Sequence, residues 1–297
     1  MNNNNQQPRT LYVSDLDGTL INSQSVLSDY TIKTLNKLIH ERNILFTVAT
    51  ARTPATVTTL LKDVDATLPF IVLAGGAVWD NHSHDYVSVR TLQPTILKQL
   101  LDIFNLHNIH PFVYRHHGQQ IRVHHTPSMT DQERQFIMPR ITTPYKTLIT
   151  EEHISADDED LAMLLFAIGP FTKLRALADD IDNLNIPCSY NCYHDIFDPS
   201  LGFLDLYTAH TNKARAIQDM AKSIHANRIV VFGDNLNDIP MMRIADWSVA
   251  VDNAFDEVKQ QANKVIGHHD DDAVIKWIEK DSTIHIKKEK DEKEKNI

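Results

Sequence analysis

Continuous apolar runs alternate with amphipathic segments near the start of the chain. The run Ile44–Ala49 contains no charged residue, which is typical of a strand buried on both faces of a sheet. Before it, apolar residues recur at helical spacing from Ile32 to Ile39, and Ser28 is a suitable N-cap for that helix. The pattern predicts strands at residues 11–14, 44–49 and 70–74, and helices at 28–43 and from residue 53 onward.

The same alternation returns near the end of the chain. Apolar residues from Ala216 to Ile224 share one face of a predicted helix that Asn212 is placed to cap, and the apolar run Ile229–Phe232 follows. A helical turn at 240–244, a strand at 248–251 and a helix at 271–279 come next. Apolar strands alternating with helices predict an α/β fold with a doubly wound parallel sheet of the Rossmann-like type. We assign residues 8–81 and 204–282 to this one discontinuous domain.

The segment between these two halves has a different character. Its predicted strands are shorter and more polar, and the acidic stretch at residues 142–160 is expected to form a loop. Two amphipathic helices are predicted within it, at 94–108 and 171–184. We therefore expect residues 82–203 to form an inserted α+β domain, and residues 1–7 and 283–297 to be disordered tails.

Charge and composition narrow the choice of partners. The formal net charge is -10, so a polyanion such as nucleic acid would be repelled on average. The longest apolar runs fall short of the ~20 residues that a membrane-spanning helix needs, and the first residues lack a signal-peptide pattern. We expect a cytoplasmic protein without membrane or nucleic-acid partners, acting as a monomer or weak homodimer.

Acidic residues follow two of the predicted strands. The two segments are Asp15-Leu16-Asp17-Gly18-Thr19 and Gly233-Asp234-Asn235-Leu236-Asn237-Asp238. Ligands bind at the carboxyl ends of the strands in open α/β sheets, so two such loops can converge on one divalent cation. Magnesium favours a few carboxylates together with water and substrate phosphate. For the first loop alone, an ordinary turn built from Asp and Gly is the alternative.

These two motifs, with Thr50 after the second strand and Lys213 before a late helix, resemble the four motifs of the haloacid dehalogenase superfamily. The resemblance is closest to the Cof-like phosphatases, whose large α/β cap of C2B type is inserted after the third core strand. It covers residues 11–78 and 204–279, and the cap matches only in position and size. The resemblance implies a magnesium-dependent phosphatase that hydrolyses a small phosphomonoester, such as a sugar phosphate, a nucleotide or a phosphorylated cofactor, through an aspartyl-phosphate intermediate.

The resemblance also implies a role for each matching residue. Asp15 would be the nucleophile, and Asp17 would act as general acid and then general base. Magnesium would be held by Asp15, by the backbone carbonyl of Asp17 and by Asp234. The phosphate group would be bound by Thr50, Lys213 and the backbone around Leu16, Gly18 and Ala51, with Asn237, Asp238 and Arg52 in support.

Two positions depart from the pattern of this branch. Ala51 stands between Thr50 and Arg52 where relatives commonly have glycine, and it would restrict the backbone if a positive φ were needed there. Gly75 stands where relatives commonly have asparagine, so a polar side chain is missing. Neither change removes a catalytic group, and both concern contacts with the substrate.

Histidine pairs and an acidic stretch are further candidates for chemistry. The pairs are His116-His117, His124-His125 and His268-His269. Adjacent residues on a strand point to opposite faces, so each pair offers at most one metal ligand, and we expect surface or loop histidines. Either His116 or His117 is a candidate for facing the substrate. The acidic residues from Glu151 to Asp160 lack the spacing of a calcium loop, and we expect a solvated loop there.

Two other functions are compatible with the same motifs. A sugar phosphomutase with this core and cap would return the phosphoryl group to a sugar, and its product would be an isomeric sugar phosphate instead of inorganic phosphate. A non-catalytic binding or regulatory protein would release no phosphate from any ester. Analysis of the products therefore separates the three hypotheses.

Overall fold

The computed structural model describes residues 9–141, 144–195 and 198–283. The chain folds into two compact units. The first comprises Met1–Ala51, Thr59–Ile71 and Lys213–Ile297, and the second comprises Arg52–Thr58 and Val72–Asn212. The boundaries predicted near residues 82 and 203 lie inside the second unit. The division into a core at 8–81 and 204–282 and an inserted domain at 82–203 stays a prediction.

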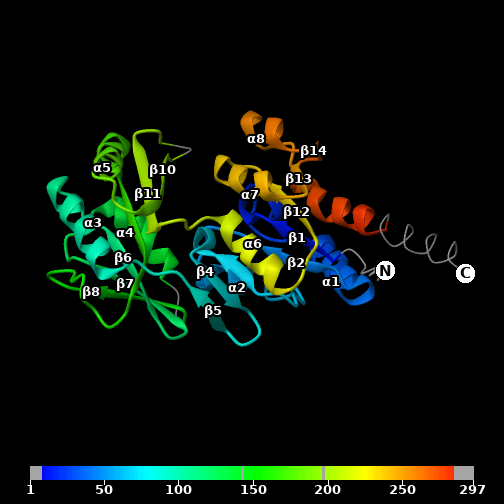
Figure 1. The fold of residues 1–297 in the computed structure, drawn as a ribbon, viewed down its shortest axis with the longest axis horizontal. Coiled ribbons are helices and arrows are strands. Elements are labelled where there is room, and N and C mark those ends of the chain that lie inside the picture. The colour runs from blue at the N-terminus through cyan, green and yellow to red at the C-terminus, as the bar shows by residue number, and fades with distance from the viewer. Residues whose placement is uncertain (1–8, 142–143, 196–197, 284–297) are drawn as a thin grey trace, which may run out of the picture. The chain divides into compact units, whose positions relative to one another are not determined.

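Within the described residues, five parallel strands form the sheet of the first unit, in the order β14-β13-β12-β1-β2 (Figure 1). The strands are β1 (Thr10–Ser14), β2 (Leu45–Val48), β12 (Arg228–Gly233), β13 (Trp247–Ala250) and β14 (Lys264–Val265). The consecutive residues Leu11, Tyr12 and Val13 of β1 are all buried, so both faces of that strand are covered. The predicted α/β fold with a parallel sheet is confirmed.

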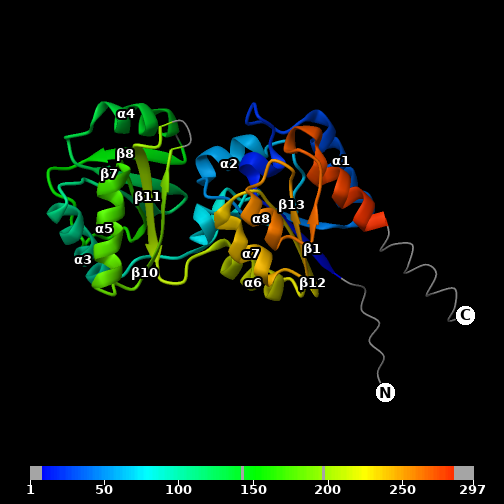
Figure 2. The same cartoon turned by 90° about the horizontal axis from the view of Figure 1, so that it is seen from above.

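Helices lie on both faces of this sheet (Figure 2). Helices α6 (Lys213–Ser223) and α7 (Ile239–Ile244) are on one face, and α1 (Asp29–Arg42) and the helix at 273–283 are on the other. A guanidinium nitrogen of Arg42 in α1 donates to the backbone oxygen of Glu279 at 2.8 Å, which links α1 to the helix at 273–283. As the sequence predicts, Ser28 caps α1 by accepting the N–H of Thr31 at 2.9 Å. The shorter helices α2 (Pro54–Leu60) and α8 (Asp256–Gln261) follow β2 and β13.

In the part of the chain that the structure describes, six strands form the main sheet of the second unit, in the order β10-β11-β9-β6-β7-β8. They are β6 (Phe112–His117), β7 (Gln120–His125), β8 (Lys146–Thr150), β9 (Ala162–Pro170), β10 (Cys188–His194) and β11 (Leu201–Thr208). Helices α3 (Pro94–Leu106) and α5 (Phe171–Asn183) pack on one side of it, and α4 (Asp131–Ile137) lies on the other (Figure 2). A smaller sheet contains β3 (Phe70–Val72), β4 (Ala77–Asp80) and β5 (Asp85–Val89). None of the described helices combines the length and the hydropathy that crossing a membrane requires.

Several local predictions are wrong. The strand predicted at 70–74 ends at Val72, because Leu73 and Ala74 both have a φ of 52° and leave the strand conformation. The expected loop at 142–160 contains β8, which pairs in parallel with β7. Helix α4 was not predicted, although Thr130 and Glu133 form a capping box at its start. Thr283 is helical instead of part of a tail, while residues 1–7, 142–143 and 284–297 lie outside the described residues.

Candidate active site

Two neighbouring strands bring the predicted acidic loops together. β1 runs parallel to β12 with Ser14 opposite Phe232, and the N–H of Asp15 donates to the Phe232 oxygen at 2.9 Å. Asp15 therefore leaves the sheet beside Asp234, which follows the last residue of β12. On the other side of β1, Thr50 follows β2 and is buried. The carboxyl ends of these adjacent parallel strands gather the residues that the sequence predicts at one edge of the sheet.

A buried lysine links two of the carboxylates. Lys213 is the first residue of α6, and its Nζ donates to Asp15 Oδ1 at 2.5 Å and to Asp238 Oδ1 at 2.7 Å. All three residues are buried. Ligand oxygens of Asp15, Asp234 and Asp238, one from each carboxylate, lie within 4.8 Å of one another. Because Asp15, Lys213 and Asp238 are buried away from water, their charges interact more strongly than they would in water.

The hydrogen bonds leave one oxygen uncommitted on each of two carboxylates. Asp238 uses both of its oxygens, since Oδ1 accepts from Lys213 and Oδ2 accepts from two backbone N–H groups of its own loop, each at 3.1 Å. Oδ1 of Asp234 accepts from the Thr19 hydroxyl at 2.9 Å. Among the described residues, no hydrogen bond reaches Oδ2 of Asp15 or Oδ2 of Asp234. These two oxygens fit a hard divalent cation, with Asp238 in an orienting position.

Burial and like charges raise the pKa values of Asp15 and Asp234. Burial raises the pKa of Asp15 well above its usual range, and the ammonium of Lys213 opposes that shift. Burial, followed by repulsion from Asp238, raises the pKa of Asp234 to about 6. Burial lowers the pKa of Lys213, but the charges of Asp15 and Asp238 more than offset this effect, so its pKa lies above the usual value. Three carboxyl groups share one lysine in this cluster, so a bound cation would relieve the repulsion that opposes their ionisation.

Gly18 allows the two acidic loops to approach each other closely. Its φ is 71°, in the left-handed region that favours glycine. A Cβ atom at this position would lie 2.5 Å from Oδ2 of Asp234. Either Asp234 or the loop would have to move to admit it, so the position of the uncommitted Asp234 oxygen depends on this glycine.

Residues from late in the chain hold the loop that follows Asp15. Asn253 is not among the predicted site residues, and His269 is predicted only as part of a histidine pair on the surface or in a loop. Nδ2 of Asn253 donates to the Gly18 oxygen at 2.7 Å, and its Oδ1 accepts the backbone N–H of His269 at 3.1 Å. Nδ1 of the His269 ring lies 2.7 Å from the oxygen of Ile21, a contact that requires a proton on Nδ1. The contacts with Gly18 and Ile21 join segments more than two hundred residues apart. No local pattern in the sequence could therefore reveal them.

The remaining predicted residues differ in exposure and in backbone conformation. Leu16 is buried, Asp17, Ala51 and Asn237 are exposed, and Arg52 belongs to the second unit. Ala51 is not among the described residues with positive φ, so alanine introduces no strain at that position. Gly75 has a φ of 95°, in the left-handed region that favours glycine, so glycine suits the backbone at this departure from the Cof-like pattern.

Two predictions about histidines and acidic residues need correction. His124 and His125 are buried, with 6% and 1% of their surface exposed, so they are not the surface histidines that we expected. His117 lies 2.9 Å from Oδ1 of Asp160, and the guanidinium of the buried Arg115 donates to the backbone oxygen of Asp160 at 2.8 Å. The end of the acidic stretch is therefore held by the sheet and is not simply a solvated loop.

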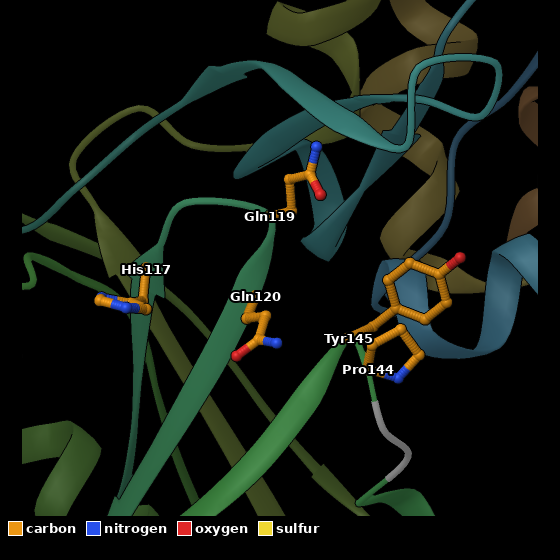
Figure 3. Close-up of a pocket in the computed structure, with 5 residues that line it drawn as sticks. All are labelled: His117, Gln119, Gln120, Pro144 and Tyr145. Carbon is orange, nitrogen blue, oxygen red and sulfur yellow. The ribbon is translucent and has the colours of Figure 1, made fainter.

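A hollow of about 310 Å³ lies within the second unit (Figure 3). It is lined by His117, Gln119, Gln120, Pro144 and Tyr145. Figure 3 shows His117 and Gln120 on the paired strands β6 and β7. No residue of the predicted active site lines it. Amide, imidazole and phenol groups there offer hydrogen bonds but no acidic cluster that would suit phosphoryl transfer.

Known proteins resemble this chain over almost its whole length. The model of the haloacid dehalogenase-like hydrolase family matches residues 12–278. Pyridoxal phosphate phosphatase YbhA of Escherichia coli (strain K12) is 25% identical over 277 residues, and the match covers 89% of this chain and 95% of that protein. The 5-amino-6-(5-phospho-D-ribitylamino)uracil phosphatase YwtE of Bacillus subtilis (strain 168) is 25% identical over 285 residues, with 89% of this chain and 95% of that protein covered.

The fold also has close counterparts among solved structures. The crystal structure of a haloacid dehalogenase-like hydrolase from Bacteroides thetaiotaomicron matches with a TM-score of 0.72 and 20% identity, covering 91% of this chain and 98% of that chain. The family match at residues 12–278 includes both acidic loops and Lys213. The resemblance that the four motifs carry in the sequence is confirmed, and the chain is an enzyme of the haloacid dehalogenase-like hydrolase family.

Proposed function

We propose that this enzyme is a magnesium-dependent phosphatase that hydrolyses a small phosphomonoester. The observation that carries the proposal is the buried Asp15 carboxylate, which contacts Lys213 through one oxygen and keeps the other uncommitted beside Asp234. A carboxylate that attacks an anionic substrate needs nearby positive charge to offset the repulsion. The two relatives named above are phosphatases, which supports the same class of reaction.

The proposed reaction has two steps that use Asp15 and Asp17. In the first, an oxygen of Asp15 attacks phosphorus, the bond from phosphorus to the leaving alkoxide breaks, and Asp17 gives its proton to the alkoxide. In the second, Asp17 takes a proton from water as the water oxygen attacks phosphorus. The bond between phosphorus and Asp15 then breaks, which releases inorganic phosphate and restores the carboxylate.

Charge compensation would come from the chain and from the metal. Lys213, the hydroxyl of Thr50 and backbone N–H groups around Gly18 would bind the phosphoryl oxygens, and Asp238 would keep Lys213 in position. A magnesium ion held by Asp15, Asp234 and the backbone carbonyl of Asp17 would supply further positive charge in the transition state. The uncommitted oxygens of Asp15 and Asp234 support this choice of ligands.

The substrate class proposed is a small phosphorylated metabolite. YbhA and YwtE are named for pyridoxal phosphate and for a phosphorylated ribitylaminouracil, so phosphorylated cofactors and related compounds are the first candidates, followed by sugar phosphates and nucleotides. As part of the same proposal, residues 8–81 and 204–282 form the hydrolase core and residues 82–203 the inserted cap domain. The enzyme would act in the cytoplasm as a monomer or weak homodimer.

Release of inorganic phosphate from a panel of these esters tests the proposal. The wild-type enzyme is expected to release phosphate with magnesium, to stop when a chelator is added and to recover when magnesium is restored. Asp15→Asn should lower turnover about a thousandfold or more, because the amide is a poor nucleophile. Asp102→Asn makes the same change on the exposed side of α3 and should leave turnover unchanged. Folded wild-type enzyme that releases no phosphate from any ester would contradict the proposal.

A further inference from the structure

One side of the six-stranded sheet in the second unit carries a lysine and a buried carboxyl group. Val113 and Leu204 belong to the hydrophobic cluster that packs under α3 and α5. Tyr114 and Asp205, one residue further along the same strands, therefore face the opposite side, which we call the α4 face. Lys146, the first residue of β8, lies on the α4 face as well, because its Nζ is 5.3 Å from the centre of the Tyr114 ring.

Lys146 is a buried cation that forms no ion pair with the described part of the chain. Only 3% of its surface is exposed, and within the described residues it has no hydrogen-bond or ion-pair partner. Burying an ionised amine without a partner is strongly unfavourable. Burial, with a smaller contribution from the charge of Arg140, lowers the pKa of Lys146 to about 8. The amine is still largely protonated at neutral pH, so a bound anion would stabilise it.

Arg140 is a second cation on the α4 face. It ends the turn Met138–Arg140 that follows α4, where its Nη1 donates to the Phe136 oxygen at 2.7 Å and its Cζ lies 3.7 Å from the centre of the Phe136 ring. Phe136 in turn stacks on Phe166 of β9, which holds the turn against the sheet. Over the part of the chain that the structure describes, Arg140 forms no ion pair. Its remaining N–H groups can serve a ligand.

The buried carboxyl group of the α4 face does not neutralise these cations. Asp205 accepts a hydrogen bond from the Tyr193 hydroxyl at 3.4 Å. Among the described residues, neither Lys146 nor Arg140 forms a hydrogen bond or an ion pair with Asp205. Lys146 and Arg140 therefore lie on the same face of the sheet, each without an ion pair among the described residues, in a chain whose formal net charge is -10.

We propose that Lys146 and Arg140 form a phosphate-binding site on the α4 face of the second unit. Lysine contributes a compact point charge, and arginine contributes a planar fork of donors that matches phosphate oxygens. The Tyr114 ring beside the lysine Nζ and the Phe136 ring beside the guanidinium hold the two cations in place. The phosphate is either free inorganic phosphate or a second anionic group of the substrate, and the latter source rests on the proposed function.

Amine labelling tests the site directly. Wild-type enzyme is treated with an amine-reactive reagent in the presence of a chelator, and mass spectrometry follows labelling at Lys146 and at Lys173, an exposed lysine of α5. Saturating inorganic phosphate should slow the labelling of Lys146 about tenfold and leave Lys173 unchanged, whereas sodium chloride of equal ionic strength should protect neither. Arg140→Gln should raise the phosphate concentration needed for protection about tenfold. Equal labelling of Lys146 with and without phosphate would overturn the proposal.

Substrate kinetics separate the two sources of the phosphate group. The variant Lys146→Gln is compared with Lys173→Gln, which removes the same charge from an exposed position. If the site binds the substrate, Lys146→Gln raises KM for esters with a second anionic group about tenfold more than KM for esters with a neutral leaving group. An unchanged ratio of these KM values, with protection of Lys146 retained in the wild type, assigns the site to free phosphate. An enzyme that hydrolyses none of the esters refutes the proposed function, while the labelling result stands independently of catalysis.

Discussion

Lys213 links the carboxylates of Asp15 and Asp238 at the edge of the sheet, close to the carboxylate of Asp234. Without its ammonium, Asp15 and Asp238 would be two buried acids in mutual repulsion, and the neutral form of Asp15 would be favoured. The sequence predicts Lys213, Asp15 and Asp238 through their motifs. The sequence does not show that both Asp238 oxygens accept hydrogen bonds. Two of the donors are backbone N–H groups, whose positions depend on how the loop turns.

Gly18→Ala should disrupt the site without unfolding the enzyme. The added Cβ meets Oδ2 of Asp234, and the positive φ adds strain of roughly 1 kcal/mol. We expect turnover to fall about a hundredfold or more, measured as phosphate release. Gly118→Ala is the matched control, since Gly118 also has a positive φ of 58° but no atom lies within 4 Å of the added Cβ. Similar turnover in the two variants would show that the contact with Asp234 has no role.

Asp205 should make the stability of the enzyme depend on pH. Burial raises the pKa of Asp205 to about 7 in the folded state, from a usual value of 3.8. Between these values the folded state holds a proton that the unfolded state has lost, so the free energy of unfolding falls as pH rises from about 4 to about 7. The loss is at most about 1.4 kcal/mol for each unit of pKa.

Asp205→Asn should remove this pH dependence. Because the amide cannot ionise, the variant should be as stable as the wild type near pH 4 and more stable above pH 7, as measured by urea unfolding at each pH. Asp102→Asn, on the exposed side of α3, should differ from the wild type by a constant amount across the range. A difference between Asp205→Asn and the wild type that does not change with pH would contradict the account.

At the scale of elements, the strands and helices around the acidic loops follow from local pattern. The apolar runs predict β1, β2 and β12, and Ser28 and Asn43 mark both ends of α1 because their backbone preferences suit the caps. Predictions fail where long-range contacts decide the conformation. β8 forms because residues 146–150 pair with β7, although the surrounding sequence is polar and acidic. The strand expected at 70–74 ends early because of positive φ values that its apolar residues do not indicate.

Asn253 and His269 hold the loop after Asp15 through hydrogen bonds, although neither residue belongs to the two acidic motifs. Asn253→Ala leaves the Gly18 oxygen without its donor and frees the loop after Asp15. We expect turnover to fall about tenfold, with a smaller change in KM, because the loop positions the nucleophile more than it binds the substrate. Asn105→Ala, on the exposed side of α3, should leave both values unchanged. Unchanged turnover in Asn253→Ala would show that the loop keeps its position without this contact.

At the scale of the whole molecule, the proposed phosphatase reaction requires Asp15 to form a bond to phosphorus. The parallel sheet brings residues 15, 213, 234 and 238 together from opposite ends of the chain, and the fold is shared with the solved haloacid dehalogenase-like hydrolase from Bacteroides thetaiotaomicron. The sequence therefore predicts which of these residues meet at one edge of the sheet, because that depends on strand order. It does not indicate the α4 face, since Lys146 and Arg140 belong to a region in which sequence patterns are weak.

Acid quenching during turnover tests this claim most directly. Wild-type enzyme is mixed with magnesium and a radiolabelled phosphomonoester that it hydrolyses, the reaction is stopped with acid within the first turnover, and the labelled peptide is identified by mass spectrometry. We predict label on the peptide that contains Asp15, bound as an acyl phosphate, and its loss in Asp15→Asn. Rapid hydrolysis by the wild type with no label on Asp15, or with label on another residue, would contradict the account.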